Sequence, residues 1–362
     1  MTEPRRLEGT VRVVGSGLLG ASIGLGLTQQ GVDVVLDDAS PAARNLAIDY
    51  GAGRAARDGD APVLIVVCVP PDVTAEIVAR ELVAYPEALV TDVASVKVAP
   101  LRDLVAGGAD VSRYIGSHPM AGRERGGPIS ARADLFVGRP WVVAGHDGIT
   151  YRAAAPLEDL ILDLGATPIE MTPEEHDAGV AVVSHAPQVV SSLMAARLRD
   201  ASDASLGLAG QGVRDVTRIA ASDPALWVQI LGANSQRVEE VLRELRDDLD
   251  DVIDALAAPS DPGALKTIAE TIGSGNAGVA RLPGKHGQST VFTQVVVMVD
   301  DKPGELGRLF TEMGEIDVNL EDLRLEHSPG AQFGLAEVSV VPEHEERLID
   351  DLAKRGWTVA GR

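Results

Sequence analysis

Short runs of apolar and β-branched residues alternate with longer stretches of helical periodicity along the first half of the chain. The runs predict strands at residues 11–14, 33–36, 63–69, 88–91, 114–115 and 141–143. Strands that alternate with helices are typical of a doubly wound, largely parallel sheet that is covered by helices on both faces. We therefore predict an α/β domain over residues 1–171.

After residue 171 the pattern becomes helical. Thr172-Pro173-Glu174-Glu175 combines a capping residue, a proline in the first turn and early acidic residues, which is typical of a helix start. The last clear helix of this part ends near Leu256 and has apolar residues on one face. Its acidic residues fall largely off that face and are predicted to be exposed: Asp247, Asp248, Asp250 and Asp251. These features predict an all-α domain over residues 172–275.

A glycine-rich segment and a second mixed pattern complete the chain. Residues 273–287 are rich in glycine, which predicts a linker or an ordered crossing loop, and we place the linker at 276–288. Strands at 293–299, 320–326, 334–341 and 357–360 and helices at 304–313 and 343–354 then follow in the order βαββαβ. That order predicts a ferredoxin-like α+β domain over residues 289–362.

Composition narrows the choice of partners. The chain of 362 residues is long enough for two or three domains, and its net charge of -22 disfavours nucleic acid and anionic membranes as partners. Its one cysteine, Cys68, suits a reducing compartment. The first nine residues lack the apolar core of a signal peptide, and polar residues interrupt the apolar stretch 180–198. We predict a cytoplasmic protein.

Gly15-Ser16-Gly17-Leu18-Leu19-Gly20 follows a predicted strand and opens a predicted helix. In that context the pattern indicates a dinucleotide-binding unit of Rossmann type. Gly15 permits a tight turn, Gly17 lets a pyrophosphate approach the helix N-terminus, and Gly20 packs the helix on the strand. Asp38 lies 18 residues after Gly20, near the expected position of the carboxylate that binds the adenosine ribose. This favours NAD, although Arg44 is close enough in sequence to keep NADP open.

His118 is the strongest candidate for proton transfer. It lies in Gly116-Ser117-His118-Pro119-Met120-Ala121-Gly122, which we interpret as a glycine-rich loop directly downstream of the dinucleotide-binding unit. Removing a hydride from an alcohol carbon needs a base for the hydroxyl proton, and histidine has the ordinary pKa nearest neutrality. Ser95, just past the strand 88–91, could hydrogen-bond His118 and orient its ring, or it could cap a helix.

Arg218 lies among apolar residues of the helical part. A buried arginine needs an anion, which could be an Asp or Glu side chain or a substrate carboxylate held by two hydrogen bonds. Trp227 is most simply a core residue. No group of His, Cys and acidic residues has the spacing of metal ligands, so no metal is predicted.

Taken in order, these motifs resemble the prephenate and arogenate dehydrogenase family of tyrosine biosynthesis along nearly the whole chain. The resemblance is carried by the motif 15–20, Cys68-Val69-Pro70-Pro71, Asp92-Val93-Ala94-Ser95-Val96-Lys97, His118-Pro119-Met120-Ala121-Gly122 with Glu124, Ser184-His185, and Asp215-Val216-Thr217-Arg218-Ile219-Ala220 with Ser222 and Trp227. The last domain resembles an ACT module, with Asp301-Lys302-Pro303-Gly304-Glu305-Leu306 at its first turn and Asp317-Val318-Asn319-Leu320 before its second strand.

The resemblance implies NAD-dependent oxidative decarboxylation of prephenate to 4-hydroxyphenylpyruvate. It implies that His118 accepts the hydroxyl proton, that Ser95 orients His118, and that Arg218 holds a substrate carboxylate. Of the other site residues, His185 would shape the pocket beside the nicotinamide and Glu124 could pair with an arginine at the pocket mouth. The remaining implied contacts are Ser222 and Trp227 for substrate, Ser16, Leu18, Leu19, Val69 and Pro70 for cofactor, and Asp301, Pro303, Gly304, Leu306 and Asn319 for an aromatic amino acid effector. The family also implies a homodimer formed by the helical domain.

Three alternatives remain open. Arogenate dehydrogenase is the first, because Arg123 and Gln188 stand where many relatives have a small hydroxyl residue and a second histidine. A 3-hydroxyacid dehydrogenase would be expected to use a lysine of the helical domain, but no lysine occurs between Lys97 and Lys266. A non-catalytic sensor of nucleotide and amino acid is the third, and the joint presence of His118, Ser95 and Arg218 disfavours it.

Overall fold

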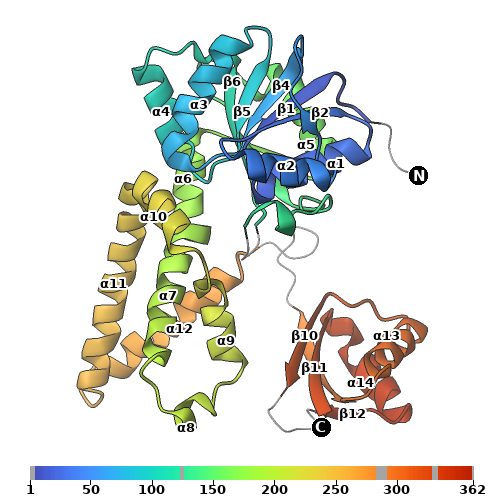
Figure 1. Ribbon diagram of the computed structural model, residues 1–362. Helices are drawn as coiled ribbons and strands as arrows, with labels where there is room; N and C mark the ends of the chain where they lie inside the picture. The colour runs from blue at the N-terminus through green and yellow to red at the C-terminus, as the bar shows by residue number, and fades with distance from the viewer. Residues whose placement is uncertain (1–4, 123–125, 283–291, 328–332, 361–362) are drawn as a thin grey trace. The chain divides into compact units, whose positions relative to one another are not determined.

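The computed structural model describes residues 5–122, 126–282, 292–327 and 333–360 (Figure 1). The chain forms two units. The first comprises Met1–Asp200 with Val216–Glu244, and the second comprises Ala201–Asp215 with Leu245–Arg362. The candidate site residue Glu124 and its neighbour Arg123 lie outside the described residues.

An eight-stranded sheet organises the first unit. Its strand order is β3-β2-β1-β4-β5-β6-β7-β8, and neighbouring strands are parallel except for the antiparallel pair β6 and β7. The strands are β1 (Thr10–Val14), β2 (Asp33–Asp37), β3 (Arg54–Ala55), β4 (Pro62–Val67), β5 (Leu89–Asp92), β6 (Tyr114–Pro119), β7 (Pro140–Ala144) and β8 (Thr167–Met171). The predicted doubly wound, largely parallel sheet is confirmed. The sequence pattern does not predict β3 and β8, because β3 has two residues and β8 is a largely exposed edge strand that contains Pro168.

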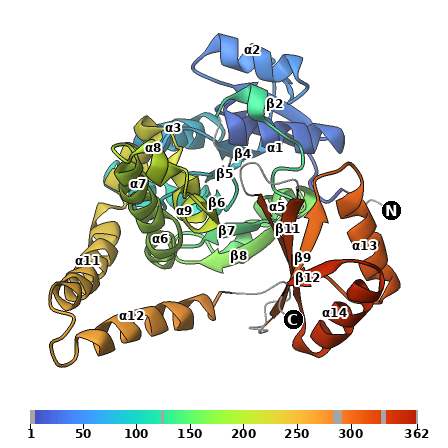
Figure 2. The same cartoon turned by 90° about the horizontal axis from the view of Figure 1, so that it is seen from below.

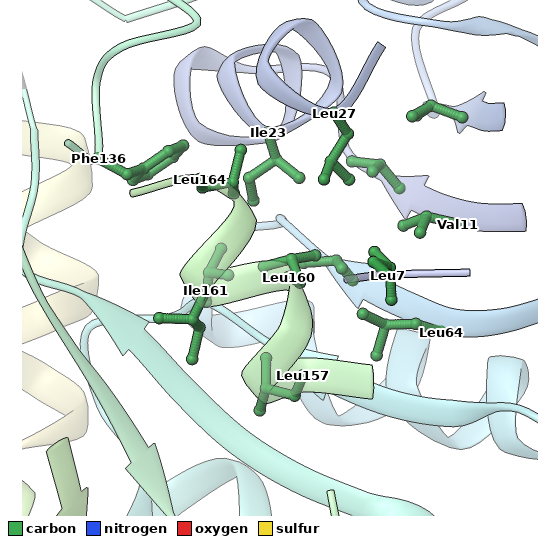
Figure 3. Packing of buried hydrophobic residues seen from close by; sticks show 14 of the residues in the cluster. Leu7, Val11, Ile23, Leu27, Leu64, Phe136, Leu157, Leu160, Ile161 and Leu164 are labelled. Carbon is green, nitrogen blue, oxygen red and sulfur yellow. The ribbon is translucent and has the colours of Figure 1, made fainter. Parts of the chain in front are cut away.

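Helices cover both faces of this sheet, and alternate strand residues supply two separate cores. Val11, Val13, Leu64 and Val66 belong to one core, whereas Val14, Ile65 and Val67 belong to the other. Figure 3 shows the first core, in which α1 (Leu18–Gln29) and α5 (Ala155–Asp163) pack over β1 and β4. The second core includes side chains of α3 (Pro71–Ala84) and α4 (Val98–Ala106). Burial on both faces explains why these strands are almost continuously apolar. The short helix α2 (Pro41–Asp49) follows β2.

The helical part begins where the sequence predicts. α6 (Pro173–Val180) starts with a capping box: the Thr172 hydroxyl accepts from the Glu175 N–H at 3.1 Å, and the Glu175 carboxylate accepts from the Thr172 N–H at 2.8 Å. A π-helical turn (Ala181–His185) joins α6 to α7 (Ala186–Leu198). Pro187 lacks an N–H and cannot donate to the carbonyl one turn earlier, which explains the wide turn. The further helices are α8 (Asp203–Leu206), α9 (Gln211–Thr217), α10 (Pro224–Ala233), α11 (Ser235–Ala257) and α12 (Ala264–Val279).

By length and composition alone, Pro173–Leu198 is apolar enough to cross a membrane, and it is the one such helix among the residues described. Its first half carries His176, Asp177 and His185, all buried. Such polar burial suits the interior of a folded domain.

The predicted linker is wrong for residues 276–279. These residues form the last turn of α12, which also includes the glycine-rich stretch from Gly273. Each glycine costs a helix about 1 kcal/mol relative to alanine. Once the preceding turns have formed, however, every added residue contributes a further backbone hydrogen bond, so a helix can extend through unfavourable residues. The part of the predicted linker at 283–288 lies outside the described residues.

The C-terminal part has the predicted βαββαβ order. Its elements are β9 (Thr293–Asp300), α13 (Glu305–Glu315), β10 (Asp322–His327), β11 (Phe333–Val340), α14 (Glu345–Lys354) and β12 (Thr358–Ala360). The antiparallel sheet has the order β10-β11-β9-β12, and both helices lie on one of its faces (Figure 2). Val297, Leu309, Leu348 and Trp357 share its core. The ferredoxin-like prediction is confirmed.

Candidate active site

The glycine loop between β1 and α1 leaves room for a ligand at one position. Gly15 has φ +100°, and Gly20 sits so close to the loop that an added methyl group would overlap the carbonyl oxygen of Gly15. Both glycines are therefore required by the backbone itself. Gly17 differs, because an added methyl group would meet nothing within 4 Å. The open space at Gly17 lies at the N-terminus of α1, where backbone N–H groups attract anions.

Ser16 and Asp38 complete this loop. The Ser16 N–H donates to Asp38 Oδ2 at 2.6 Å, which places the Asp38 carboxylate against the glycine loop. Asp37, in contrast, forms a 2.6 Å ion pair with Arg12. Within the described residues, the buried hydroxyl of Ser16 has no hydrogen-bond partner. An unpartnered buried hydroxyl costs free energy, so this loop fits a polar ligand such as the pyrophosphate of a dinucleotide.

His118 lies on strand β6, not on the loop that the glycine content predicts, and it pairs with Val142 of β7. Its ring is half-buried, and its Nδ1 lies 2.8 Å from Nε2 of His176. Burial lowers the pKa of His118 well below its ordinary value, and the neighbouring His176, Lys97 and His185 lower it further. His118 is therefore uncharged near neutral pH, as a base must be.

Ser95 occupies the loop between β5 and α4 and is half-buried. In the part of the chain that the structure describes, its hydroxyl makes no hydrogen bond to His118, whose Nδ1 is engaged by His176. A contact from Ser95 would therefore have to reach His118 Nε2.

Asp177 fixes the position of His176. Its carboxylate accepts from His176 Nδ1 at 2.7 Å, from the backbone N–H of Lys97 at 2.8 Å and from that of Val98 at 3.0 Å. The two backbone groups lie at the N-terminus of α4, with Lys97 as its N-cap and Val98 as its first residue, so Asp177 of α6 connects the helical part to the sheet domain. These hydrogen bonds lower the pKa of Asp177 against the opposing effect of its burial. Sequence reasoning missed both residues; the only local signal is a His-Asp pair directly after a capping box.

A buried ion pair contacts the backbone of β6. Lys97 Nζ contacts Asp92 Oδ1 and donates to the carbonyl oxygen of Ser117 at 2.7 Å, and both charged side chains are at most 1 % exposed. Tyr114 donates its hydroxyl to the other Asp92 oxygen at 2.7 Å. Gly116 leaves space for the lysine, since an added methyl group would lie 3.0 Å from Lys97 Cδ. This network holds β5 and β6 in register beside His118.

His185 is buried at the end of the π-helical turn. The side-chain nitrogen of Asn234 donates to the Asp177 carbonyl oxygen at 2.8 Å, and this contact distinguishes the nitrogen of the Asn234 amide from its oxygen. The same nitrogen lies 3.1 Å from His185 Nδ1. His185 Nδ1 must then accept, which leaves the proton on Nε2. Burial lowers the pKa of His185 to about 4, so its ring is a neutral donor. The Trp227 ring lies edge-on to His185, with 6.0 Å between centroids.

The remaining predicted substrate residues are less buried than the sequence suggests. Arg218 begins a 3-10 turn and is exposed, and it forms no ion pair with a carboxylate among the described residues. Trp227, interpreted as core, is only half-buried. The Ser222 hydroxyl donates to the Ile219 carbonyl oxygen at 2.6 Å and lies 3.3 Å from Gln188 Oε1. The exposed Arg218 needs no internal counterion, because water solvates its charge.

The predicted effector residues lie at two turns of the C-terminal part. Asp301, Pro303 and Gly304 are exposed between β9 and α13, and Gly304 has φ +95°, which favours glycine. Leu306 is half-buried, and Asn319 donates its amide to Glu321 at 2.7 Å before β10.

Comparison with known proteins identifies the family. Residues 23–170 match the nucleotide-binding domain of prephenate dehydrogenase, and residues 172–270 match its dimerization domain. The chain is 35% identical to the Streptomyces niveus protein named probable prephenate dehydrogenase NovF, over 96% of this chain and 98% of that protein. The chain belongs to the prephenate dehydrogenase family.

Two solved structures of this family share the fold. Synechocystis arogenate dehydrogenase is 27% identical with a TM-score of 0.60, and the match covers 74% of this chain and 99% of that one. A. aeolicus prephenate dehydrogenase, solved with hydroxyphenyl propionate and NAD+, is 23% identical with a TM-score of 0.65 over 76% and 99% of the two chains. The prephenate dehydrogenase domains end at residue 270, whereas the similarity to NovF also extends over most of the C-terminal part.

Proposed function

We propose that the protein is an NAD-dependent prephenate dehydrogenase that oxidatively decarboxylates prephenate to 4-hydroxyphenylpyruvate in tyrosine biosynthesis. Its membership of the family supports this activity, and the position of His118 carries the assignment. An uncharged histidine, with one nitrogen engaged by His176, lies on β6 of the sheet whose strand β1 leads into a glycine loop that fits a dinucleotide.

The residues of the glycine loop account for cofactor binding. The open space at Gly17, the unpartnered Ser16 hydroxyl and the N-terminus of α1 would hold the pyrophosphate, with Leu18 and Leu19 beginning that helix. Asp38 would bind the ribose hydroxyls, and Val69 and Pro70 flank the loop from the end of β4. NAD, when bound, accepts the hydride.

His118 performs the proton step in this proposal. Its free nitrogen takes the proton of the substrate hydroxyl as the hydride leaves the carbon that bears this hydroxyl. Loss of carbon dioxide then makes the substrate ring aromatic. Arg218 would hold a substrate carboxylate, and His185 would offer its Nε2–H to a substrate oxygen, with Trp227 beside it. Ser222 and Glu124 keep the roles that the family resemblance implies, whereas the orienting contact to His118 Nδ1 comes from His176 and not from Ser95. Because aromatisation supplies the driving force, alignment and proton acceptance are what these residues need to provide.

The test is NADH formation, followed by its absorbance, with purified protein, NAD and either prephenate or arogenate. We expect turnover of prephenate that collapses in His118→Asn and persists in His146→Asn, a histidine whose ring bonds the Tyr114 carbonyl oxygen outside the site. Turnover of arogenate alone would keep the mechanism and replace the substrate. Turnover of neither substrate, with NAD still bound, would contradict the proposed activity and favour the sensor.

The helical part is proposed to form a homodimer. Its residues match a dimerization domain, and several apolar side chains on α7 and α11 are more than half exposed: Leu193, Leu249, Ile253 and Leu256. Exposed apolar side chains favour burial against a partner. The acidic run of α11 is exposed, as predicted. Sedimentation analysis of the full chain tests this proposal, since a monomer at micromolar concentration would contradict it.

The protein is proposed to be cytoplasmic.

The C-terminal part is proposed to act as an ACT-like regulatory domain that binds an aromatic amino acid. The effector site would be formed by Asp301, Pro303, Gly304, Leu306 and Asn319. We expect tyrosine to inhibit the full chain but not a protein that ends at Gly287. Equal sensitivity of both proteins would place the effector elsewhere.

A further inference from the structure

A chain of three side chains extends from the candidate base into the protein. His118 Nδ1 lies 2.8 Å from His176 Nε2, and His176 Nδ1 lies 2.7 Å from Asp177 Oδ1. The two imidazole rings meet edge to face, with their planes at 71° and their centroids 5.1 Å apart. His176 and Asp177 are at most 3 % exposed, so water does not compete for these bonds.

The hydrogen bonds of Asp177 fix where each proton sits. Three nitrogens lie within hydrogen-bond distance of its carboxylate, and two of them are the backbone N–H groups of Lys97 and Val98, which can only donate. A carboxylate so surrounded is ionised and accepts from every neighbour. The proton of His176 is therefore on Nδ1, facing Asp177.

His176 in turn fixes the proton of His118. Burial lowers the pKa of His176, which keeps its ring neutral with a bare Nε2. A bare nitrogen can only accept, so His118 must donate to it from Nδ1. The nitrogen of His118 that carries no proton is then Nε2. Without an acceptor at Nδ1, the proton of a neutral imidazole is free to occupy either nitrogen.

We propose that His176 and Asp177 are positioning residues that hold His118 as its Nδ1–H tautomer, with Nε2 bare to receive the hydroxyl proton of the substrate. This inference rests on the proposed function for the identity of the proton donor. After proton transfer His118 becomes an imidazolium, and His176, backed by the negative charge of Asp177, accepts from its Nδ1–H. Among the described residues, the other charged or titratable groups near the pair are Asp92 of β5, Lys97 from the turn after β5, and His185.

Steady-state kinetics of two His176 variants test the role of the acceptor. His176→Gln retains a side-chain oxygen that can accept from His118 Nδ1, whereas His176→Leu has none. We expect kcat to fall by about 10²–10⁴ in His176→Leu, the range seen when a general base or its orienting partner is lost. We expect His176→Gln to recover most of that loss, with KM for NAD near the wild-type value in both variants.

A purely structural role for His176 would lower the stability of both variants without separating their kcat values. Folding is checked by circular dichroism and by NAD binding, and His146→Asn serves as the matched histidine control. A folded His176→Leu with wild-type kcat and pH profile would overturn the proposal. If wild-type protein turned over neither substrate, the proposed function would fail, and the tautomer would still be decided by the next measurement.

Nuclear magnetic resonance of protein labelled with ¹⁵N-histidine reads the tautomer directly. The His118 signals are assigned by their loss in His118→Asn. We expect a protonated Nδ1 and a bare Nε2 for His118 near neutral pH, and in Asp177→Asn a partial shift toward the other tautomer. A proton found on Nε2 of His118 in the wild-type protein would refute the inference whatever the enzyme's activity.

Discussion

Gly17 and Gly20 occupy the same loop but have opposite surroundings, which predicts opposite effects of the same substitution. In Gly20→Ala the new methyl group would overlap the carbonyl oxygen of Gly15 and lie 3.1 Å from Val13 Cγ1. The Gly15 carbonyl oxygen belongs to the backbone and cannot rotate away as a side chain can. Helix α1 must therefore shift away from β1 to make room for the methyl group. Overpacking of this kind costs about 1–3 kcal/mol. For a domain of this size, each kcal/mol lowers the Tm by about 2–4 °C.

In Gly17→Ala the methyl group meets no protein atom within 4 Å, and the backbone there (φ -69°, ψ -161°) is open to alanine. Alanine is a poorer helix cap than glycine but restricts the unfolded chain, and these two effects, each up to about 1 kcal/mol, oppose one another. We therefore expect an almost unchanged Tm. The methyl group fills space that the pyrophosphate needs, so NAD affinity should fall about tenfold or more, equivalent to about 1.4 kcal/mol.

The assay pairs thermal unfolding without ligand with calorimetric titration of NAD, for both variants and for Gly212→Ala. Gly212 lies in α9 and its added methyl group also meets nothing within 4 Å, so this control should leave NAD affinity unchanged. Wild-type NAD affinity in Gly17→Ala would refute the assignment of the open space to the cofactor. Wild-type stability in Gly20→Ala would refute the packing argument.

Three further predictions follow from the buried and charged groups. First, kcat/KM should fall with decreasing pH only below 6.5, because burial lowers the pKa of the base His118. The free energy of unfolding should fall in the same pH range, because the histidines of the unfolded chain bind protons that the buried ones do not. A decrease of kcat/KM that begins above pH 6.5 would contradict this. Second, Lys97→Met should lower the free energy of unfolding, measured in urea, by about 3–5 kcal/mol, because it leaves the Asp92 carboxylate buried and without its ion-pair partner. Adding Asp92→Asn should recover part of that loss, and equal stability of the single and double variants would argue against this reasoning. Third, Asp38→Ser should raise KM for NAD and lower KM for NADP, since it removes the carboxylate that a 2′-phosphate would meet; unchanged KM values would show that Asp38 does not contact the ribose.

The elements of the fold follow from local patterns in the sequence. The strands of the first sheet are readable because a buried parallel strand is apolar on both faces, as Leu64, Ile65, Val66 and Val67 illustrate by serving two cores. The capping box at Thr172 and the βαββαβ order are equally local. The glycine-rich stretch from Gly273 led to the wrong prediction of a linker at residues 276–279. Composition reports only the intrinsic propensity of each residue, and a helix can extend through residues of low helix propensity.

The sequence by itself determined the domain order, the glycine loop and the candidate base His118. Only the tertiary structure decided what surrounds that base. His176 and Asp177 lie 58 and 59 residues after His118 in sequence, and no periodicity links a strand to the first turns of a distant helix. Their roles arise because α6 packs where its Asp177 can cap α4, and a hydrogen bond depends on distances in space that sequence spacing does not encode.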